Sequence, residues 1–553
     1  MTTLRLAQDI PTLSIANLHL IDNKVAKPNP SRDLRQEPIR IVHIGATSRF
    51  ASSFMFSIVD DYNNASPDNA MGVSAVSIRR PEKEEQFRAA ADLRAEQARQ
   101  DGMYTLLQKS NNVVIPRVVA SVQEYVAAYE NPDLVRARLA SRDVTVVSLT
   151  ITPGSYKVNL DESIDAPETW IGYLLRAMLD RREQGIPLPT ILSCDNVKNN
   201  GELAKRCILA LAERQCHPDI VEWLRENIKA PNTMVDRITP ETTVADRQYV
   251  NTVLGYADVA PTVCETFRQF VISNDVGPNF PALHTVPGVQ MTDDVEKFER
   301  TKLWALNGSH RAIAYIGFLI GTQMVSDAFA PIIQDGKNMG TPMLGRFIGG
   351  LMDEFESAVP DIAGVDKDAY INSLLRRFSD ASLGDQVARV GKDGSEKVAG
   401  RLLDPIRVQL EKGGNIDYLA FAVAAWIRYL TGIHNNSTLF DINDNKAERN
   451  GLQEAARAIK RQYEDTKEET GRGDIDLSFL FQLPESIFGH DLQRDSRFTI
   501  AVTAALKSIY DLGMEGALKQ MMPQSKSNIL PREEVTINGL TLAKIMGQKT
   551  RVA

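Results

Sequence analysis

The strongest constraint on the fold lies near the start of the chain, where an apolar run, Ile39–Ile44, is followed by Gly45. A short run rich in Ile and Val is typical of a buried strand, and a glycine directly after it allows a tight turn. The residues from Phe54 to Tyr62 then have the pattern of a helix. A strand, a glycine turn and a helix in this order predict the βα opening of an α/β domain.

Strand-like and helix-like patterns continue to alternate after this opening. Strands are expected at Gly72–Ile78, Asn112–Val114, Val144–Ile151 and Thr190–Cys194, and helices at Ser121–Tyr129 and Glu202–Glu213. The charged segment Arg79–Asp101 is typical of a solvated helix. Strands that alternate with helices predict a doubly wound, mainly parallel sheet, which is the fold of a Rossmann-like domain.

The pattern changes near Val295, beyond which long helical periodicities dominate. A chain of 553 residues is also too long for a single hydrophobic core. We therefore expect a Rossmann-like dinucleotide-binding domain over residues 1–294 and a mostly α-helical substrate-binding and catalytic domain over residues 295–553. Two apolar stretches, Ala312–Thr322 and Tyr418–Ile427, are far shorter than the roughly 20 residues of a membrane-spanning helix. They are expected to be buried core helices, and no membrane association is expected.

Composition and charge narrow the class of function. The chain is 43% hydrophobic, and its net charge of −8 comes from 63 basic and 71 acidic residues that are mixed along the chain. Without a basic face or tail, binding of nucleic acid is not expected, and a small molecule fits better as the partner. The 4 cysteines form no CxxC pair, and the first residues have no signal-peptide pattern. Both features favour a reducing compartment and a cytoplasmic location.

The turn after the first strand is a candidate cofactor site. It consists of Gly45, Ala46, Thr47, Ser48, Arg49 and Phe50, and it keeps only the first glycine of the GxGxxG pattern. A dinucleotide site needs a close approach of the backbone to the pyrophosphate and the N–H groups of a helix N-terminus. Thr47, Ser48 and Arg49 offer hydrogen bonds and positive charge to phosphate. A plain βα turn explains the same residues about as well.

The end of the second strand bears on the choice of nucleotide. An acidic residue there usually binds the ribose hydroxyls of NAD. This chain has Ser77-Ile78-Arg79-Arg80 instead. Arg79 is therefore a candidate cofactor contact, and two arginines at this place favour NADP, although they also fit the start of the solvated segment. NAD and NADP both stay open.

Lys302, Asn307 and His310 are the candidate catalytic residues. On a helix that turns about 100° per residue they fall within roughly 140° of one another, so they can face one cleft. Lysine suits proton removal from an alcohol because burial near other cations lowers the pKa of an amine toward neutrality. An asparagine can donate to the developing alkoxide or carbonyl oxygen, and a histidine can hold a neighbouring hydroxyl. On spacing alone, a polar surface face explains the three residues equally well.

The literal string KxxxxNGSH, from Lys302 to His310, resembles the signature of the long-chain polyol-specific dehydrogenase family. That family includes mannitol 2-dehydrogenase, arabinitol dehydrogenase, and the reductases of fructuronate and tagaturonate. Three further blocks resemble the family in the same order: SCDN from Ser193, NTMVDRITP from Asn232, and RVGKDGSEK from Arg389. Weaker similarity extends from about residue 38 to residue 510.

The resemblance implies a metal-independent oxidoreductase that uses NAD or NADP to interconvert a polyol of the mannitol type and its ketose. It implies that Lys302 is the base, while Asn196 and Asn307 stabilise the reacting oxygen. The remaining implied roles are substrate binding by His310, Asp236, Arg389 and Lys397, and a link from the base to solvent at Glu299.

Two alternatives stay open within the resemblance. A hexuronate reductase of the same family would use Arg389 and Lys397 to bind a substrate carboxylate, so the partner is a polyol or a sugar acid. A non-catalytic member with a binding role is the other alternative, because the family usually has GxGxFxRAH where this chain departs from Gly45 onward. A monomer or a small homo-oligomer is expected.

Other enzyme classes find no support in the sequence. A zinc-dependent dehydrogenase would need a convergent set of ligands, whereas the 7 histidines are scattered and no HExxH or paired-cysteine spacing occurs. No metal is therefore expected. A serine hydrolase would need a GxSxG elbow, which is also missing from the sequence.

Overall fold

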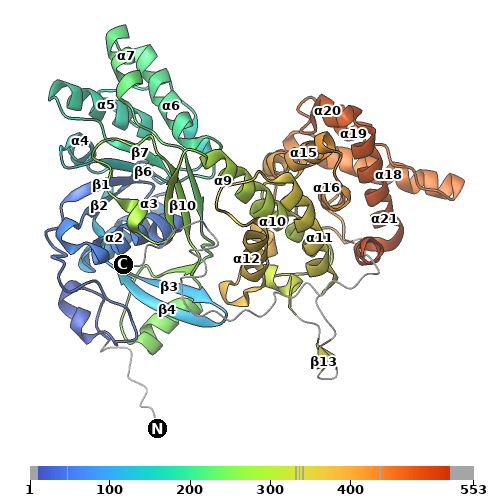
Figure 1. Cartoon of the computed structure of the whole chain (residues 1–553), viewed down its shortest axis with the longest axis horizontal. Coiled ribbons are helices and arrows are strands. Elements are labelled where there is room, and N and C mark those ends of the chain that lie inside the picture. The colour runs from blue at the N-terminus through green and yellow to red at the C-terminus, as the bar shows by residue number, and fades with distance from the viewer. Residues whose placement is uncertain are drawn as a thin grey trace. The chain divides into compact units, whose positions relative to one another are not determined.

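The computed structural model describes residues 10–46, 48–330, 333–334, 337–338, 342–434 and 438–522. The chain forms two compact units, Met1–Glu296 and Lys297–Ala553 (Figure 1). The first is an α/β unit built around a parallel sheet, and the second is mostly helical. This confirms the expected fold class, a Rossmann-like unit followed by a helical one.

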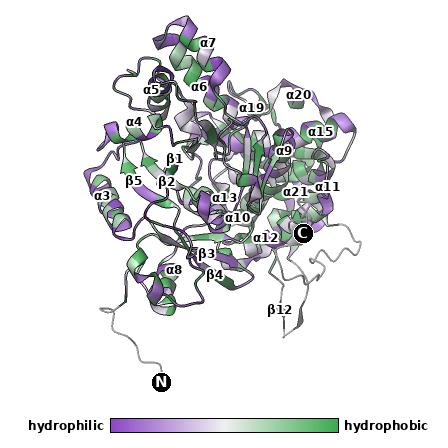
Figure 2. Cartoon of the chain, turned by 60° about the vertical axis from the view of Figure 1, so that its left-hand side comes forward, coloured by the Kyte–Doolittle hydropathy of each residue, from purple (hydrophilic) through white to green (hydrophobic). Residues whose placement is uncertain are grey.

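Five parallel strands form the central sheet of the first unit. Their order across the sheet is β5 (Val122–Ala127), β2 (Gly72–Ser77), β1 (Ile39–Ile44), β6 (Val146–Leu149) and β7 (Thr190–Ser193). Most residues of these strands are buried, as in sheets that helices cover on both faces. Figure 2 accordingly shows hydrophobic residues along β1 and β2 and hydrophilic ones along the outer helix α3 (Glu84–Arg99). The strand order reverses between β1 and β6, which is where doubly wound sheets bind ligands.

Helices and two smaller sheets complete the first unit. The other helices are α1 (Arg49–Ala51), α2 (Ser57–Ala65), α4 (Pro132–Ala140), α5 (Trp170–Glu183), α6 (Asn200–Gln215), α7 (Pro218–Asn227) and α8 (Val244–Gln248), with π-helical turns η2 (Ser52–Phe56) and η5 (Tyr249–Leu254). The 3₁₀ turns are η1 (Ile15–Leu20), η3 (Pro67–Asn69), η4 (Pro153–Tyr156) and η6 (Leu283–Thr285). One small sheet has the order β11 (Val289–Thr292), β10 (Gln269–Ser273), β8 (Thr233–Asp236), and the other β4 (Val113–Val119), β3 (Tyr104–Ser110), β9 (Thr262–Glu265).

Two elements differ from the sequence-based expectation. The helix expected over Ser121–Tyr129 is wrong, because this segment forms the strand β5, which pairs in parallel with β2. The strand expected at Asn112–Val114 is observed as β4 (Val113–Val119), which begins one residue later and is longer, because Asn111 and Asn112 form the turn of a β3–β4 hairpin. Both asparagines have positive φ, 49° and 64°, as the tight turns of hairpins require. A pair of asparagines before Val113 was the signal for this hairpin.

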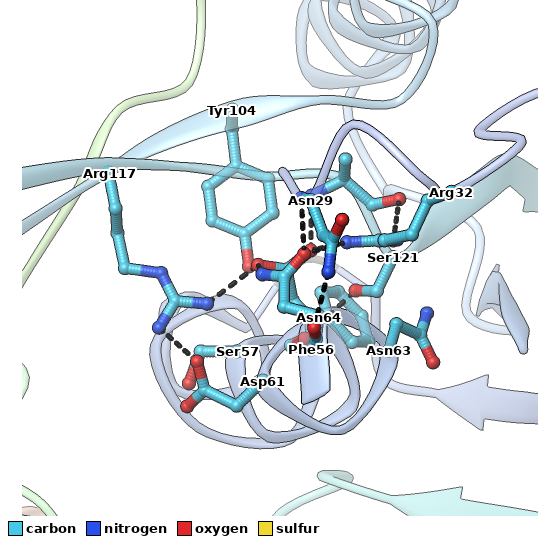
Figure 3. Close-up of polar contacts among 12 residues, drawn as sticks. Asn29, Arg32, Phe56, Ser57, Asp61, Asn63, Asn64, Tyr104, Arg117 and Ser121 are labelled. Carbon is cyan, nitrogen blue, oxygen red and sulfur yellow. Dashed lines mark hydrogen bonds and ion pairs between the residues drawn. The ribbon is translucent and has the colours of Figure 1, made fainter. Parts of the chain in front are cut away.

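Buried ion pairs attach the segment before β1 to helix α2 (Figure 3). Arg32 donates to Glu37 at 2.7 Å and to Asp60 at 2.7 Å, and the side chains of Arg32 and Asp60 are fully buried. Arg117 pairs with Asp60 at 2.6 Å and also with Asp61. Charges removed from water in this way are retained only when they are paired, so the network holds β1 and the helix that follows it in one arrangement.

The second unit is built from helices. They are η7 (Lys302–Gly308), α10 (Ser309–Leu319), η8 (Val325–Ala328), α11 (Met343–Ala358), α12 (Lys367–Ser379), η9 (Ala381–Leu383), α13 (Val387–Gly391), α14 (Gly394–Val398), η10 (Ala399–Leu403), α15 (Asp404–Lys412), α16 (Asp417–Tyr429), α17 (Asn445–Arg449), α18 (Leu452–Thr470), α19 (Ser478–Phe481), α20 (Gly489–Arg494) and α21 (Ser496–Met521). Helix α9 (Val295–Thr301) leads into η7, and β12 (Ile333–Gln334) pairs with β13 (Lys337–Asn338).

The centre of the second unit is helix α16, which packs against α10, α11 and α21. Every residue from Leu419 to Tyr429 is buried. The two apolar stretches noted in the sequence therefore lie in core helices, α10 and α16, as expected. In the described part of the chain, no helix combines the length and apolar character needed to cross a membrane.

The start of α16 is capped by a buried carboxylate from α11. Glu354 accepts hydrogen bonds from the backbone N–H groups of Tyr418 at 3.0 Å and Leu419 at 2.8 Å. Burial raises the pKa of Glu354 to about 7, from an ordinary value of 4.5. Because the folded-state pKa lies above the unfolded-state value, this group favours folding below about pH 4.5, and its contribution is lost as pH rises through about 7.

We therefore expect the free energy of unfolding to fall by roughly 2 to 3 kcal/mol between pH 4.5 and pH 8 through Glu354. Urea unfolding followed by far-UV circular dichroism at several pH values measures this slope. Glu354→Gln should flatten it, whereas Glu411→Gln, at an exposed position of α15, should leave it unchanged. Parallel pH profiles for the wild type and Glu354→Gln would contradict the assignment.

Candidate active site

Gly45 follows β1 at the strand-order reversal and has a conformation that other residues rarely adopt. Its φ is +112°, and a Cβ atom at this position would lie 2.2 Å from the carbonyl oxygen of Thr150. Thr150 comes directly after β6, so the ends of the two central strands approach each other more closely than a side chain permits. Glycine is therefore required here by backbone contact. The same close packing is what a dinucleotide site needs at this edge.

A buried histidine on β1 stabilises this turn through hydrogen bonds. His43, on β1, lies between the hydroxyls of Ser148 at 2.8 Å and Thr150 at 2.9 Å. The Thr150 hydroxyl donates to the Gly45 carbonyl at 3.2 Å, so Nε2 of His43 donates to Thr150 and Nδ1 accepts from Ser148. Burial lowers the pKa of His43 to about 3, and the ring is therefore neutral, with one donor and one acceptor. These bonds fix the orientation of the Gly45 carbonyl.

The remaining turn residues lead into the helix. The backbone N–H groups of Gly45 and Ala46 donate to Val76 at the end of β2, at 2.9 and 3.2 Å, which ties the turn to that strand. Ser48 is the residue before helix α1. The exposed Arg49 forms an ion pair with Glu241 at 3.0 Å, and Phe50 stacks on Phe54. Thr47 lies outside the described residues.

A strained loop follows β6 at the same edge of the sheet. Thr152 has φ +70°, a left-handed conformation that is costly for a β-branched residue. Asp195, just after β7, accepts from the backbone N–H groups of Ile151 and Thr152, both at 3.1 Å, and from the hydroxyl of Tyr156 at 2.9 Å. The aspartate of the SCDN block thus holds the strained loop, and it places the next residue, Asn196, in an exposed position.

The asparagines of the sequence blocks hold three elements together. The side-chain amide of Asn200 donates to the carbonyls of Asp195 and Thr233, both at 3.1 Å, and its oxygen accepts from Thr233 N–H at 2.9 Å. The oxygen of Asn232 accepts from the first N–H groups of α6, Gly201 and Glu202, both at 3.0 Å. These bonds join β7, α6 and β8. Residues of the SCDN and NTM blocks thus hold the loop that contains Asn196 in position.

The DRITP residues connect β8 to the helix after the glycine turn. Asp236 is the last residue of β8 and is 2% exposed. Arg237 donates to the backbone carbonyl of Ser53 at 2.6 Å, and the hydroxyl of Thr239 contacts that of Ser53 at 2.7 Å. The block therefore braces the helix that begins at Arg49. Gly45, Asn196 and Asp236 of the first unit thus all lie in segments that hydrogen bonds fix to neighbouring elements.

The second unit carries the candidate catalytic helix. α9, η7 and α10 form one continuous helix from Val295 to Leu319, and its middle turn, Lys302–Gly308, is π-helical. In a π turn the hydrogen bonds join residues five apart, so such residues stand above one another. Lys302 and Asn307 are five apart, and the wider turn brings them closer to one face than the α-helical spacing predicts. Lys302 is 7% exposed and Asn307 is half-buried.

His310 follows this turn and is buried as a neutral side chain. It is 9% exposed and packs against the ring of Phe378 at 4.6 Å. Burial, followed by the positive charges of Arg389 and three other arginines, lowers its pKa well below the ordinary value. Among the described residues, Nε2 of His310 has no hydrogen-bond partner. A buried polar atom of this kind is costly unless a ligand or water satisfies it, so His310 is well suited to contact a substrate hydroxyl.

Arg389 and Lys397 lie on the short helices α13 and α14. The guanidinium of Arg389 pairs with Asp385 at 2.6 Å, and the same arginine contributes to the positive field at His310. Lys397 donates to the backbone carbonyl of Lys392 at 2.9 Å and to Asp393 at 3.3 Å. Within the second unit, Arg389 therefore belongs to the surroundings of His310, while Lys397 belongs to a neighbouring group of cations.

A family model described as the mannitol dehydrogenase Rossmann domain matches residues 39–284, and one described as the mannitol dehydrogenase C-terminal domain matches residues 294–510. The chain belongs to the mannitol dehydrogenase family. The resemblance inferred from the sequence blocks is thus confirmed, and so is membership in a family of oxidoreductases.

Individual members of the family are similar over most of the chain. Mannitol 2-dehydrogenase of Aspergillus fumigatus is 33% identical over 445 residues, which cover 77% of this chain and 82% of that protein. Mannitol dehydrogenase 2 of Saccharomyces cerevisiae is 32% identical over 455 residues, covering 79% and 85%. Pseudomonas fluorescens mannitol 2-dehydrogenase, solved with NAD and D-mannitol, has a TM-score of 0.75 and 28% identity, covering 92% of this chain and 99% of that one. A D-sorbitol dehydrogenase with 24% identity and a TM-score of 0.77 shares the fold.

In this member of the mannitol dehydrogenase family, two further arginines lie near the blocks found in the sequence. Arg311 donates to the Lys392 carbonyl at 2.8 Å, the same acceptor that Lys397 uses. Burial, followed by Arg311, lowers the pKa of Arg401 to about 9. Gly308 permits this packing, because a Cβ atom there would lie 2.7 Å from the Arg401 carbonyl. Both arginines could have been found from the sequence, because Arg311 directly follows NGSH and Arg401 lies one helical turn after Lys397.

Among the residues that the structure describes, no group of three or more histidine, cysteine, aspartate or glutamate side chains is arranged to hold a metal ion. Cys194, Cys207, Cys216 and Cys264 are all free.

Proposed function

We propose that this chain is a metal-independent NAD(P)-dependent oxidoreductase that interconverts a polyol of the mannitol type and its ketose by hydride transfer. The observation that carries the proposal is the buried Lys302 at the start of a π turn, in the order Lys302, Asn307, His310, within a member of the mannitol dehydrogenase family. The solved relative that held NAD and D-mannitol supports both the nucleotide and the polyol.

The first unit has the features that a dinucleotide requires. Gly45 allows the backbone approach at the strand-order reversal, and the helix that begins at Arg49 presents its N-terminus there. We propose that residues 1–294 bind the nucleotide through Gly45, Ala46, Thr47, Ser48, Arg49, Phe50 and Arg79. When bound, the nicotinamide supplies the acceptor for the hydride that leaves the alcohol carbon.

The second unit and two loops of the first would supply the residues that act on the substrate. We assign proton removal from the reacting hydroxyl to the Lys302 amine, and donation to the developing carbonyl oxygen to the amides of Asn307 and Asn196. Most of the substrate-binding residues would come from residues 295–553. Its other hydroxyls would be oriented by His310, Arg389, Lys397 and Asp236, and Glu299 would pass the proton on to solvent.

A hexuronate reductase is the second candidate, and one observation favours it. His310 lies in the field of Arg389, Arg377, Arg311 and Arg401, of which Arg389 has the largest effect. A substrate carboxylate would complement such a field, whereas a neutral polyol would use the same groups as hydroxyl donors. The partner is accordingly a polyol or a sugar acid. A cytoplasmic location, which the four free cysteines favour, and a monomer or small homo-oligomer complete the proposal.

The test is a nicotinamide absorbance assay with NADH and NADPH against fructose, fructuronate, tagaturonate and several pentuloses. Oxidation of the nucleotide with fructose is expected, and the rate should be unchanged by prior treatment with a chelator. A preference for fructuronate or tagaturonate would favour the second candidate. No turnover with any ketose, together with no nucleotide binding by calorimetry, would overturn the proposal and favour a non-catalytic member of the family.

A further inference from the structure

We infer that the first unit selects NADP(H) over NAD(H) by binding the 2′-phosphate at the end of β2, through Ser77, Arg79 and Arg80. This inference rests on the proposed function, because it concerns the choice of nucleotide at the same site. In doubly wound sheets the adenosine ribose lies at the end of the second strand. An acidic side chain there binds the ribose hydroxyls of NAD, and an arginine accommodates the 2′-phosphate of NADP.

The geometry of β2 places these residues next to the glycine turn. β1 and β2 pair in register with Ile44 opposite Val76, and the N–H groups of Gly45 and Ala46 donate to the Val76 carbonyl at 2.9 and 3.2 Å. Ser77, the last residue of β2, is therefore the next residue beyond this contact. After Ile78 come Arg79 and Arg80. Ser77 and these two arginines therefore lie where a bound nucleotide would place its adenosine ribose.

Carboxylates at this place are absent or already engaged. From Ser77 to Pro81 the chain has no acidic residue, and the first one is Glu82. The carboxylates of the neighbouring β5 segment pair with arginines elsewhere: Glu124 with Arg138 at 2.8 Å, and Glu130 with Arg94. Within Ser77–Pro81 no carboxylate is thus available to bind a ribose 2′-hydroxyl or to repel a 2′-phosphate.

Arg79 is a cation that a phosphate can recruit at low cost. The Arg79 side chain is 85% exposed. It forms an ion pair with Glu82, three residues later in the chain, and the Glu82 side chain is 78% exposed. Exposed pairs of this kind contribute little to stability, so they exchange readily for a stronger partner. A phosphate with nearly two negative charges is such a partner, because arginine binds its oxygens in a bidentate way.

Arg80 is held by an aromatic ring rather than by a carboxylate. Its guanidinium lies 5.1 Å from the centroid of the Phe87 ring on α3, and Phe87 contacts Tyr129 at 5.8 Å. In the described part of the chain Arg80 forms no ion pair. A guanidinium held over an aromatic ring loses less side-chain entropy when it binds a phosphate, and it can also stack on a base. Arg79 and Arg80 together therefore form a cationic site that is only partly neutralised, by the exposed pair of Arg79 with Glu82.

The test compares the binding of NADPH and NADH to the full chain by calorimetry, with 2′,5′-ADP and 5′-AMP as probes of the phosphate alone. NADPH should bind about tenfold tighter than NADH, and 2′,5′-ADP tighter than 5′-AMP, with a difference that shrinks as salt is added. Arg79→Ala/Arg80→Ala should weaken NADPH at least tenfold more than it weakens NADH, so that the preference for NADPH is lost. Ser77→Asp should reverse the preference.

Arg88→Ala is the matched control, because Arg88 is an exposed arginine of α3 that pairs with Glu84 at 3.1 Å. It should change neither affinity. Tighter binding of NADH by the wild type, or equal loss of both nucleotides in the double variant, would overturn the inference while leaving the proposed function in place. Binding of neither nucleotide would instead overturn the proposed function.

Discussion

Lys302→Ala is expected to lower kcat for polyol oxidation by about a thousandfold or more while the fold remains intact. A positioned general base contributes on the order of 10² to 10⁴ to the rate, and alanine leaves no group at this position that can accept the proton. Lys302 is 7% exposed in the π turn, so water replaces its amine poorly. Steady-state kinetics in both directions measure the loss, and calorimetry should show nucleotide affinity unchanged.

Two further measurements separate a base from a structural lysine. Small amines added to Lys302→Ala should restore part of the turnover, because they can enter the space left by the side chain and accept the proton. Lys446→Ala, at an exposed lysine that pairs with Glu396 at 2.6 Å, should keep native kinetics. Turnover near the native level in Lys302→Ala would refute the assignment of Lys302 as the base. Another residue would then have to accept the proton.

Gly45→Ala is expected to weaken nucleotide binding at least tenfold and to lower the free energy of unfolding by about 3 kcal/mol. The added Cβ atom would lie 2.2 Å from the Thr150 carbonyl oxygen and 2.6 Å from its hydroxyl oxygen, and φ at Gly45 is +112°. To relieve this contact, the turn must move away from β6. That movement also breaks the bonds that join Thr150 to His43 and to the Gly45 carbonyl.

Urea unfolding and nucleotide calorimetry test this prediction together. Gly154→Ala is the matched control, because a Cβ atom at Gly154 meets nothing within 4 Å and this glycine does not need a positive φ. The control should match the wild type in both measurements. If Gly45→Ala unfolds at the same urea concentration as Gly154→Ala and binds the nucleotide equally well, the turn is not the constraint that the geometry indicates.

Local patterns were enough to predict much of the first unit. The run Ile39–Ile44 is observed as β1 with the same bounds, and the strand expected at Gly72–Ile78 is observed as β2 (Gly72–Ser77), because continuous apolar runs of this length fit a sheet that is covered on both faces. Segment Ser121–Tyr129 was predicted as a helix, whereas it is strand β5. Its mixture of Val, Gln, Glu and Tyr fits either period, and only pairing with β2 decides for a strand.

The residues of the candidate site could be named from the sequence, but their supports could not. Asn196 and Asp236 stand in blocks whose other members, such as Asn200 and Asn232, join β7, α6 and β8 through bonds across about 30 residues of chain. Arg377 and Arg401, whose charges act on His310, were likewise missed. Their effect depends on the distance between helices that are separate in the sequence, and no local pattern encodes that distance.

Lys302 illustrates the division between sequence and tertiary structure. The sequence alone determined the α/β order followed by helices and the position of the glycine turn, because both depend on residue type and short-range spacing. Its resemblance to the family named Lys302, Asn307 and His310 as the candidate catalytic residues. Only the tertiary structure decided that the helix widens to a π turn at Lys302–Gly308, where Gly308 admits the Arg401 carbonyl and residues five apart share a face. The physical reason is that a π turn is less favourable than an α-helical turn in isolation, so the packing of neighbouring helices must stabilise it.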